Sequence, residues 1–329
     1  MRKVIYLFKR IIGLDYKNMF RIAKKISKKT HKNKFLIIID MIKCGFKYQA
    51  GYYDYLEFEF YLLNDKQRST YLTRGKNNEI IRKYNNKEKA YQFDDKQVFN
   101  KMFKQFLGRE YINLDNNLEE FKQFLKNKKE IIIKPLDGEG GKGVEKIKVN
   151  SDIEKLYQKL INNNQTLVEE VIKQHKQMNK LYDKSVNTLR MFTFVKDGKA
   201  YFLQAILKIG NGGVIDNFSS GGMYTFVDNN GVVLAPAIDQ DDNYFEKHPL
   251  TNEKIVGFKV PLFNEAVELV RKAALIVPDM AYVGWDVAIG EDKPILVEGN
   301  WFPGVFQMKP SFKENKDGIL TLYKKYMDI

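Results

Sequence analysis

A lysine and a glycine-rich loop meet in residues 131–143 of this chain, in an arrangement suited to holding phosphate groups. The β-branched run 131–133 predicts a buried strand that delivers Lys134 to its end, and Pro135 stops the strand because it has no N–H donor. The next eight residues hold four glycines and a second lysine, Lys142. Glycine lets main-chain N–H groups converge on an anion, and two ammonium groups beside such a loop favour a polyphosphate. The segment therefore predicts a nucleoside triphosphate site.

Several kinds of phosphate loop contain glycine at this density. Gly138, Gly140 and Gly143 match the dinucleotide fingerprint, but that fingerprint opens a helix, whereas the alternation over residues 144–149 predicts a strand. A P-loop is excluded because Lys142 is followed by glycine rather than Ser or Thr. The His-Arg-Asp and Asp-Phe-Gly signatures of protein kinases are absent from the sequence. A strand–loop–strand phosphate site and a surface hairpin with basic tips remain as alternatives.

A second group of polar residues lies far downstream, where residues 284–300 predict two short strands joined by the polar turn 290–293. Asp286 falls on the first strand, and Glu298 and Asn300 share one face of the second because they are two residues apart. Three oxygen ligands suit Mg²⁺, a hard cation that keeps waters and binds substrate phosphates. The alternative is an exposed polar strand face, but the surrounding apolar residues place these carboxylates near a core, where an unpaired charge is costly.

Taken in order, these motifs resemble the ATP-grasp superfamily. The shared features are Lys134 with its glycine loop, Leu167–Ile172, Asn187–Arg190, and Asp286 followed by Glu298 and Asn300. The sequence is most similar to the sugar-transfer-associated branch, found near polysaccharide-assembly genes, and the likeness covers roughly residues 50–310. The features of that branch are Gln174-His175, Ser185–Arg190, Asp216–Gly222 and Gly284-Trp285-Asp286. The resemblance implies an α+β ATP-grasp fold, in which two α+β subdomains clasp ATP.

The resemblance also implies nucleotide-binding residues. Lys134 and the loop residues Gly140, Gly141 and Lys142 would hold the α- and β-phosphates, and Lys96 matches an earlier lysine that also reaches ATP. The adenine would be read by main-chain groups of a hinge formed by Glu169, Glu170, Val171 and Ile172. The superfamily often has a carboxylate for the ribose just past this hinge. Here that place holds Gln174 and His175, so one of them must substitute or the ribose contact comes from elsewhere.

The same resemblance implies the catalytic, metal and acceptor residues. Arg190, Lys134 and Asn187 would be catalytic, with Arg190 stabilising charge on the transferred phosphoryl group or a later tetrahedral intermediate. Asp286, Glu298 and Asn300 would bind one or two Mg²⁺ ions. Hydroxyl and amide groups beyond the γ-phosphate would line the acceptor pocket; they come from Asn217, Ser219, Ser220 and Gly221.

These roles predict an ATP- and Mg²⁺-dependent ligase that joins a carboxylate to an amine through an acyl phosphate, in the synthesis of a cell-surface polysaccharide such as a capsule. Its substrates would be small or glycan-linked. Stabilising a phosphoryl group in flight needs cations and no activated side-chain nucleophile, which fits a chain with one cysteine and three histidines. His31 and His248 are predicted at the surface. The alternative is a phosphotransferase acting on a sugar or lipid-linked acceptor.

Length and composition set the domain organisation. A chain of 329 residues, 44% of them hydrophobic, predicts two or three compact units with a substantial core. We expect a helical basic region over 1–90, a nucleotide-binding lobe over 91–180 and a lobe with the metal and acceptor sites over 181–329. The single cysteine excludes an internal disulfide and fits a reducing compartment, the cytoplasm.

Positive charge is concentrated at the N-terminus. Residues 1–50 hold 14 Lys or Arg against two Asp, a net charge of +12 out of +14 for the whole chain. Apolar residues at helical spacing among these lysines predict that residues 1–30 contact an anionic membrane at its inner face. The alternative is a helical cap packed on the enzyme. Nucleic acid is not an expected partner because no binding module is recognisable.

Overall fold

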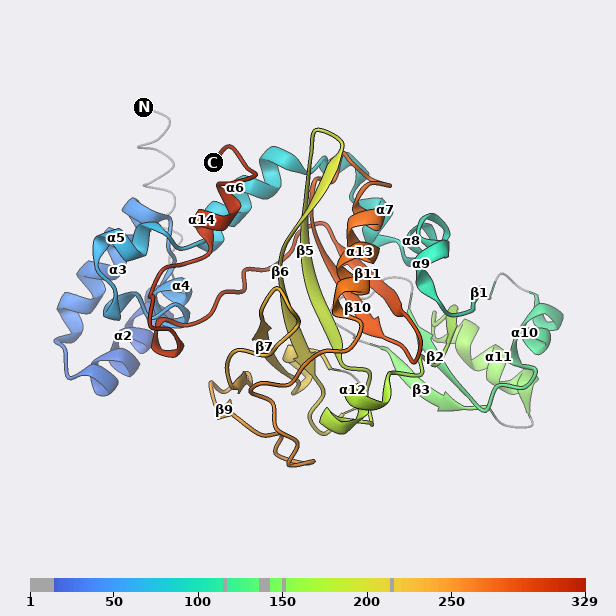
Figure 1. The fold of residues 1–329 in the computed structure, drawn as a ribbon. Helices are drawn as coiled ribbons and strands as arrows, with labels where there is room; N and C mark the ends of the chain where they lie inside the picture. The colour runs from blue at the N-terminus through green and yellow to red at the C-terminus, as the bar shows by residue number, and fades with distance from the viewer. Residues whose placement is uncertain (1–14, 115–116, 136–142, 150–151, 214–215) are drawn as a thin grey trace. The chain divides into compact units, whose positions relative to one another are not determined.

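The computed structural model describes residues 15–114, 117–135, 143–149, 152–213 and 216–329 (Figure 1). The chain divides into two compact units. One comprises the described residues up to Ile80 together with Gly304–Ile329, and the other is Ile81–Pro303. Two side-chain hydrogen bonds to main-chain carbonyls join the C-terminal segment to the rest of the first unit: Gln307 Nε2 donates to Leu72 O at 2.8 Å and the Tyr71 hydroxyl donates to Lys316 O at 3.1 Å. The predicted lobe over 181–329 includes this segment, because no local pattern in the sequence indicates so distant a partner.

The first unit is helical. Its elements are α2 (Tyr16–Thr30), α3 (Lys34–Tyr48), α4 (Tyr52–Glu57), η1 (Phe60–Leu62), α5 (Asp65–Ser69), α6 (Arg74–Tyr84, which continues into the second unit), η4 (Pro310–Phe312) and α14 (Leu320–Tyr323). Asp15 and Asn33 cap α2 and α3 by accepting from main-chain N–H groups. The inner face of α2 is buried at helical spacing, at Met19, Ile22, Ala23 and Ile26. Among the described helices, none has both the length and the apolar character needed to cross a membrane.

The second unit contains a small antiparallel sheet in the order β1-β4-β2-β3. Its strands are β1 (Tyr111–Asn113), β2 (Glu130–Lys134), β3 (Glu145–Lys148) and β4 (Leu167–Glu170). Helices α10 (Leu118–Leu125) and α11 (Ile153–Asn162) pack on the apolar side chains of one face, among them Ile131, Ile133 and Val168. Because strand side chains alternate, Lys134 and Glu169 lie on the opposite face. The predicted strands on either side of the glycine loop are confirmed as β2 and β3.

Short helices precede this sheet and lead into it. They are η2 (Lys87–Lys89), α7 (Tyr91–Asp94), α8 (Lys96–Met102) and α9 (Lys104–Leu107). α12 (Lys176–Leu181) follows the sheet. Phe93, Phe99 and Phe103 pack together, and Phe93 and Phe103 contact Trp285, so these helices are anchored on the larger sheet described next.

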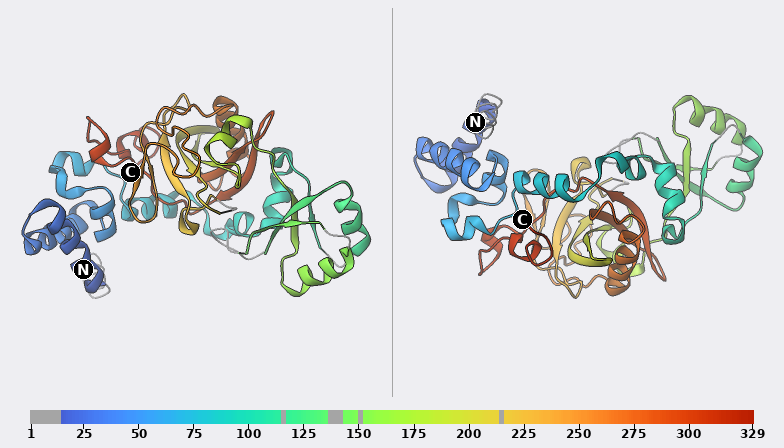
Figure 2. Two further views of the ribbon diagram at one scale, coloured as in Figure 1. Left: turned by 90° about the horizontal axis from the view of Figure 1, so that it is seen from below. Right: turned by 90° about the horizontal axis from the view of Figure 1, so that it is seen from above.

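The larger sheet has the order β11-β10-β5-β6-β7-β8-β9, with every neighbouring pair antiparallel. The strands are β5 (Thr188–Lys196), β6 (Lys199–Ile209), β7 (Met223–Val227), β8 (Ala237–Ile238), β9 (Tyr244–Phe245), β10 (Tyr282–Ile289) and β11 (Pro294–Asn300); η3 (Phe218–Ser220) precedes β7. α13 (Phe263–Ala274) packs across β5, β6, β10 and β11 (Figures 1 and 2). The predicted hairpin over 284–300 is confirmed, with Gly290 N donating to Lys293 O in its turn.

Candidate active site

Four neighbouring strands of the large sheet each carry one charged side chain, and the four side chains form a row across the sheet. In the strand register, Asp286 of β10 lies opposite Arg190 of β5 on one side and Glu298 of β11 on the other. Arg190 pairs with Ile206 of β6, and Lys208 stands two residues further along that strand, on the same face. We call Glu298, Asp286, Arg190 and Lys208 the charged row. Its order across the sheet is two carboxylates followed by two cations.

Asp286 is the centre of the charged row. Its side chain is 3% exposed, and its carboxylate accepts from both Arg190 Nε and Arg190 Nη2, the latter at 2.9 Å. Lys208 Nζ lies 2.8 Å from the same carboxylate. Burial alone would raise the pKa of Asp286, but the charges of Arg190 and Lys208 outweigh it and hold the pKa below its usual range. Asp286 therefore stays ionised and fixes two cations beside it.

Glu298 and Asn300 complete the predicted metal set at the edge strand. The Glu298 side chain is 53% exposed, and Arg190 Nη2 lies 3.8 Å from its carboxylate. Asn300 Nδ2 is 3.5 Å from the same carboxylate. Among the described residues no three His, Cys, Asp or Glu side chains form a metal-binding cluster. Two carboxylates and an amide oxygen nevertheless suit Mg²⁺, which takes few protein ligands and completes its shell with water and phosphate oxygens.

Asp216 joins the charged row to the predicted acceptor loop. Its carboxylate accepts from Thr188 N at 2.8 Å and Thr188 Oγ1 at 2.5 Å, and Lys208 Nζ lies 3.9 Å away. The loop that follows begins with η3 and ends at Gly221, whose φ of +93° favours glycine. Of the acceptor residues predicted there, Ser220 is exposed, Asn217 is half-buried, and the side chain of Ser219 lies outside the described part of the structure.

Asn187, predicted to be catalytic, is fully buried in a network of main-chain contacts. Its amide nitrogen donates to Gln174 Oε1, Met178 O and Tyr182 O, and its oxygen accepts from Gly210 N. Gln174 is buried in the same network. These hydrogen bonds fix Asn187 directly before the start of β5, the strand that carries Arg190. The catalytic role of Asn187 stays a prediction.

The two histidines near the site also bond to the main chain. His175 caps α12, accepting from Gln177 N through Nδ1, and its own main-chain N–H donates to Ile289 O. The surface position predicted for His248 is wrong. His248 is 1% exposed, its Nε2 is 2.8 Å from Gly210 O, and its ring stacks on Tyr182. Burial lowers the pKa of His248, which fits a neutral ring that donates to this carbonyl.

A second charged cluster lies on the free face of the small sheet. Lys134 Nζ is 2.6 Å from the Glu169 carboxylate, and Arg109 binds the same carboxylate through Nε at 2.9 Å and Nη2 at 3.0 Å. Glu169 is buried, and Asn100 Nδ2 also donates to it. Burial would raise the pKa of Glu169, but Arg109 and Lys134 hold it below its usual range. We call Lys134, Arg109 and Glu169 the lysine cluster.

Arg109 also connects the lysine cluster to the large sheet. Its Nη1 donates to Leu296 O at 2.7 Å and its Nη2 to Val297 O at 3.3 Å, on the strand that carries Glu298. The sequence predicts neither Arg109 nor Lys208 as a site residue. Each is a single basic residue whose carboxylate partner lies 60 or 78 residues away, so no local spacing marks it.

A pocket of about 190 Å³ lies where the hinge meets the β10–β11 turn. It is lined by Gly108, Arg109, Glu170, Val171, Ile172, Lys173, Gly290, Glu291, Asp292, Lys293 and Ile295. The ladder between β2 and β4 ends at Glu170, and the next pairing is the bridge between Gln174 and Gly290, so Val171 and Ile172 lie between two sheet contacts. Of the four predicted hinge residues, Glu169 does not line the pocket because its side chain belongs to the lysine cluster.

Four other residues are predicted to bind the nucleotide: Lys96 and the loop residues Gly140, Gly141 and Lys142. Lys96 is the first residue of α8 and is partly buried. Gly140, Gly141 and Lys142 lie outside the described residues.

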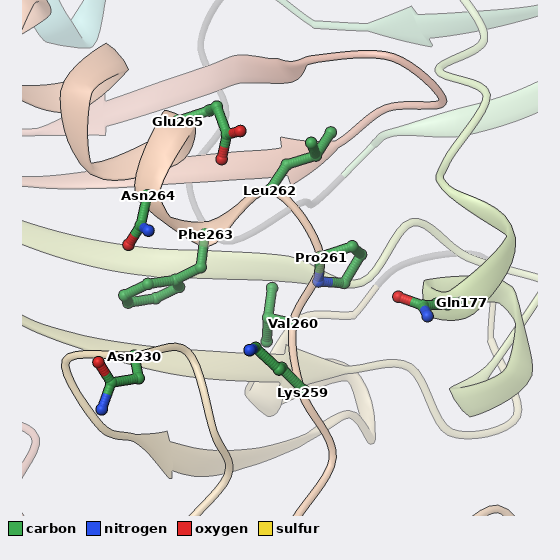
Figure 3. Close-up of a pocket in the computed structure, with 9 residues that line it drawn as sticks. All are labelled: Gln177, Asn230, Lys259, Val260, Pro261, Leu262, Phe263, Asn264 and Glu265. Atoms are coloured by element: carbon green, nitrogen blue, oxygen red, sulfur yellow. The ribbon is translucent and has the colours of Figure 1, made fainter.

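Another pocket, of about 360 Å³, lies at the start of α13 (Figure 3). It is formed by Gln177 of α12, Asn230 and the segment 259–265, and it contains none of the predicted site residues. It also contains no member of the charged row or the lysine cluster. We therefore place the candidate active site at those two clusters and not at this pocket.

The sequence matches the sugar-transfer associated ATP-grasp family over residues 75–314. The chain belongs to that family. The predicted branch and the α+β ATP-grasp fold are confirmed. ATP and Mg²⁺ are the cofactors typical of ATP-grasp enzymes.

Solved structures give more distant similarities. The chain is 12% identical to PsnB, an ATP-grasp ligase solved with the precursor peptide PsnA2 and AMPPNP; the match covers 74% of this chain and 61% of that one, with a TM-score of 0.42. It is 15% identical to D-cycloserine synthetase DcsG (70% and 68% covered, TM-score 0.42). It is 17% identical to D-alanine–D-alanine ligase from Bacillus anthracis complexed with ATP (70% and 64% covered, TM-score 0.38). The chain thus spans about three fifths of the length of PsnB. No curated protein matches it significantly.

Proposed function

We propose that this protein is an ATP- and Mg²⁺-dependent carboxylate–amine ligase that acts in cell-surface polysaccharide biosynthesis. The observation that carries the proposal is the charged row, in which two carboxylates suited to a cation stand beside two fixed cations suited to a phosphoryl group. The lysine cluster of the same unit adds a further positively charged group, Lys134. Arg109 of that cluster donates to Leu296 O on β11, the strand that carries Glu298 of the charged row. Family membership supports the use of ATP, and the sugar-transfer association of the family supports a glycan-linked substrate.

The residues present fit both cofactors. Asp286, Glu298 and Asn300 would hold Mg²⁺, and Lys134 would hold phosphate oxygens. The adenine would enter the 190 Å³ pocket, where Val171 and Ile172 bring main-chain groups to its wall. When bound, Mg²⁺ and ATP supply an activated phosphoryl group and neutralise its charge.

The chain's own contribution is electrostatic. A substrate carboxylate oxygen attacks the γ-phosphorus, the bond to ADP breaks, and an acyl phosphate forms. The neutral substrate amine then attacks the acyl carbon, the C–O bond to phosphate breaks, and the departing phosphate takes up the proton that the nitrogen loses as the amide forms. Arg190 and Lys208, held in place by Asp286, stabilise the negative charge that develops on the phosphoryl oxygens and then on the tetrahedral oxyanion. The loop with Asn217, Ser219, Ser220 and Gly221 would receive the acceptor because Asp216 ties that loop to Lys208.

A paired substitution tests the site. Lys134→Ala should weaken Mg²⁺-ATP binding about tenfold or more in calorimetry, a loss of about 1.4 kcal/mol or more. Lys208→Met should leave that affinity within about twofold and slow turnover instead, because we place Lys208 on the charge that develops during the reaction. Lys155→Ala is the matched control, since this exposed lysine belongs to α11, which packs on the opposite face of the small sheet. Wild-type ATP affinity in Lys134→Ala would contradict the assignment.

The product of the reaction separates ligase from phosphotransferase. The protein is incubated with Mg²⁺-ATP and candidate carboxylate, amine and sugar acceptors, and the products are identified by mass spectrometry. A new amide with release of ADP and phosphate is the expected result. A phosphate ester, with ADP as the only other product, would establish the alternative.

We also propose a cytoplasmic location and a peripheral contact of residues 1–30 with an anionic membrane. The support is the charge of α2, which carries six Lys or Arg and no Asp or Glu in its sequence, YKNMFRIAKKISKKT. Such a helix is attracted to anionic lipid and released by salt.

A further inference from the structure

The outer face of α3 is apolar, which is unusual for a helix at the edge of a unit. A surface helix normally buries one stripe and presents polar residues on the other face. α3 buries Ile37, Ile38, Met41, Cys44 and Tyr48. Its opposite face exposes Phe35 (64%), Leu36 (65%), Ile39 (48%), Ile42 (40%) and Phe46 (48%). Four of these follow the spacing i, i+4, i+7 and i+11, so they form one continuous stripe along the helix. We call the five residues the α3 stripe.

Lysines accompany the α3 stripe on two neighbouring helices. Lys43 and Lys47 are the other exposed residues between Phe35 and Lys47 on α3. α2 packs against α3 (Figures 1 and 2). The exposed cations of α2 are Lys17, Arg21, Lys24, Lys25, Lys28 and Lys29. The single acidic residue of α3, Asp40, is paired with Arg68 at 2.7 Å and accepts from Tyr55 at 2.6 Å. The helix pair therefore presents apolar and cationic groups, and its one carboxylate on α3 is already neutralised.

We propose that the α3 stripe inserts into the interface of an anionic lipid bilayer while the lysines of α2 and α3 contact the headgroups. An exposed apolar stripe of aromatic and aliphatic residues with flanking lysines is the combination that binds such an interface. A cationic rim complements anionic headgroups, whereas a neutral apolar protein groove offers no opposite charge. Two lysines of the rim also form ion pairs within the unit, Lys29 with Glu59 at 3.4 Å and Lys47 with Asp65 at 2.5 Å. The proposal deepens the peripheral contact proposed above. It moves the apolar anchor from residues 1–30 to residues 35–46 and does not depend on the ligase chemistry.

The test uses the full chain and sedimentation with vesicles of phosphatidylcholine, with or without phosphatidylglycerol. The wild type should bind the anionic vesicles and not the neutral ones. The triple variant Phe35→Ser, Ile39→Ser, Phe46→Ser should lose affinity for the anionic vesicles by a factor of about ten or more. Its melting temperature and ATP affinity should equal those of the wild type, because these side chains are already exposed. Leu250→Ser with Leu275→Ser is the matched control, since both leucines are exposed in the other unit.

Other results would overturn the proposal, each in a distinct way. Unchanged vesicle binding in the α3 variant, with binding lost in Lys24→Gln, Lys28→Gln, would leave only the basic-segment proposal standing. A lower melting temperature in the α3 variant would show that another part of the chain covers the stripe. Dimerisation of the wild type in light scattering, abolished by the variant and without vesicle binding, would make the stripe an interface between copies. None of these results would affect the ATP-binding test, so the two proposals fail independently.

Discussion

The lysine cluster and the charged row each hold a buried carboxylate between two cations, but the acidic residues around them give the two sites different net charges. In both, a buried carboxylate is held between two cations: Glu169 between Arg109 and Lys134, and Asp286 between Arg190 and Lys208. The lysine cluster contains no further acid, so two cations and one carboxylate give a net charge of +1. The charged row adds Glu298, so two carboxylates balance its two cations. Asp216 lies beside Lys208 as a third carboxylate outside the row, and with it the group has a formal net charge of −1.

The difference indicates how one unit attracts two ligands of opposite charge. A net positive cluster favours phosphate oxygens, and a net negative one favours a metal cation. The polyphosphate with its Mg²⁺ is complementary to both clusters at once. The buried carboxylate in each cluster acts mainly to hold its cations in place, since Glu169 and Asp286 are almost fully buried and already paired.

The largest expected effect is on stability, where the two clusters should behave alike. Asp286→Asn and Glu169→Gln each leave two buried cations without their carboxylate. We expect each to lower the free energy of unfolding by about 3 kcal/mol or more in urea titrations. Asp292→Asn, an exposed residue of the β10–β11 turn, is the control. A loss in only one of the two variants would show that the clusters are not equivalent clamps.

A smaller effect separates the clusters by function. Glu298→Gln keeps the shape of the side chain and removes a charge that Mg²⁺ needs. Turnover should fall by about 100-fold, or about 2.7 kcal/mol of transition-state stabilisation. Stability should change by less than about 0.5 kcal/mol because the side chain is half-exposed. Steady-state kinetics over a range of Mg²⁺ concentrations checks this, with Glu246→Gln as the control, since Glu246 is exposed and lines neither pocket. Wild-type turnover at all concentrations would remove the support for the metal assignment.

The smallest expected effect is a pH dependence shared by both clusters. The pKa values of Glu169 and Asp286 are lowered in the folded protein, so folding favours their charged forms. This stabilisation is fully present above the unfolded-state pKa of about 4 and is lost as the pH falls further towards the folded-state values. Stability should therefore be insensitive to these groups between about pH 5 and 8 and should fall below about pH 4. In Glu169→Gln and Asp286→Asn the acid-induced fall, followed by urea titration at each pH, should be shallower. An equally steep fall in both variants would mean that other groups dominate.

Much of the fold was predictable from the sequence because its signals are local. The β-branched run before Lys134 and the alternation after the glycine loop identify β2 and β3. The apolar runs around Asp286 and before Glu298 identify the β10–β11 hairpin. β2 alternates between buried and partly exposed residues, whereas every residue of β10 is buried, so in β10 the continuous apolar run identifies the strand.

The site was predictable only in part because its charge pairs are not local. Lys208 stands in a long strand of mostly apolar residues, and only the pairing of β5 with β6 and β10 brings it to Asp286. Arg109 precedes a three-residue strand and meets Glu169 only when β1 pairs with β4. The buried position of His248 likewise depends on a carbonyl 38 residues away. Such partners need the tertiary fold, which a sequence pattern does not contain.

The contacts of Arg109 have a consequence for how the binding of the nucleotide and the binding of Mg²⁺ influence each other. One guanidinium holds the carboxylate that positions Lys134 and also the two carbonyls that precede Glu298 on β11. In the proposed site, a shift of this guanidinium would disturb both the lysine proposed to bind phosphate and the strand that carries the proposed metal ligand Glu298. We expect positive cooperativity: the affinity for the nucleotide should be higher when Mg²⁺ is present, and the affinity for Mg²⁺ should be higher when the nucleotide is present. By thermodynamic reciprocity, the factor by which Mg²⁺ tightens the nucleotide equals the factor by which the nucleotide tightens Mg²⁺. A single buried side chain thereby turns two sites into one thermodynamically coupled unit.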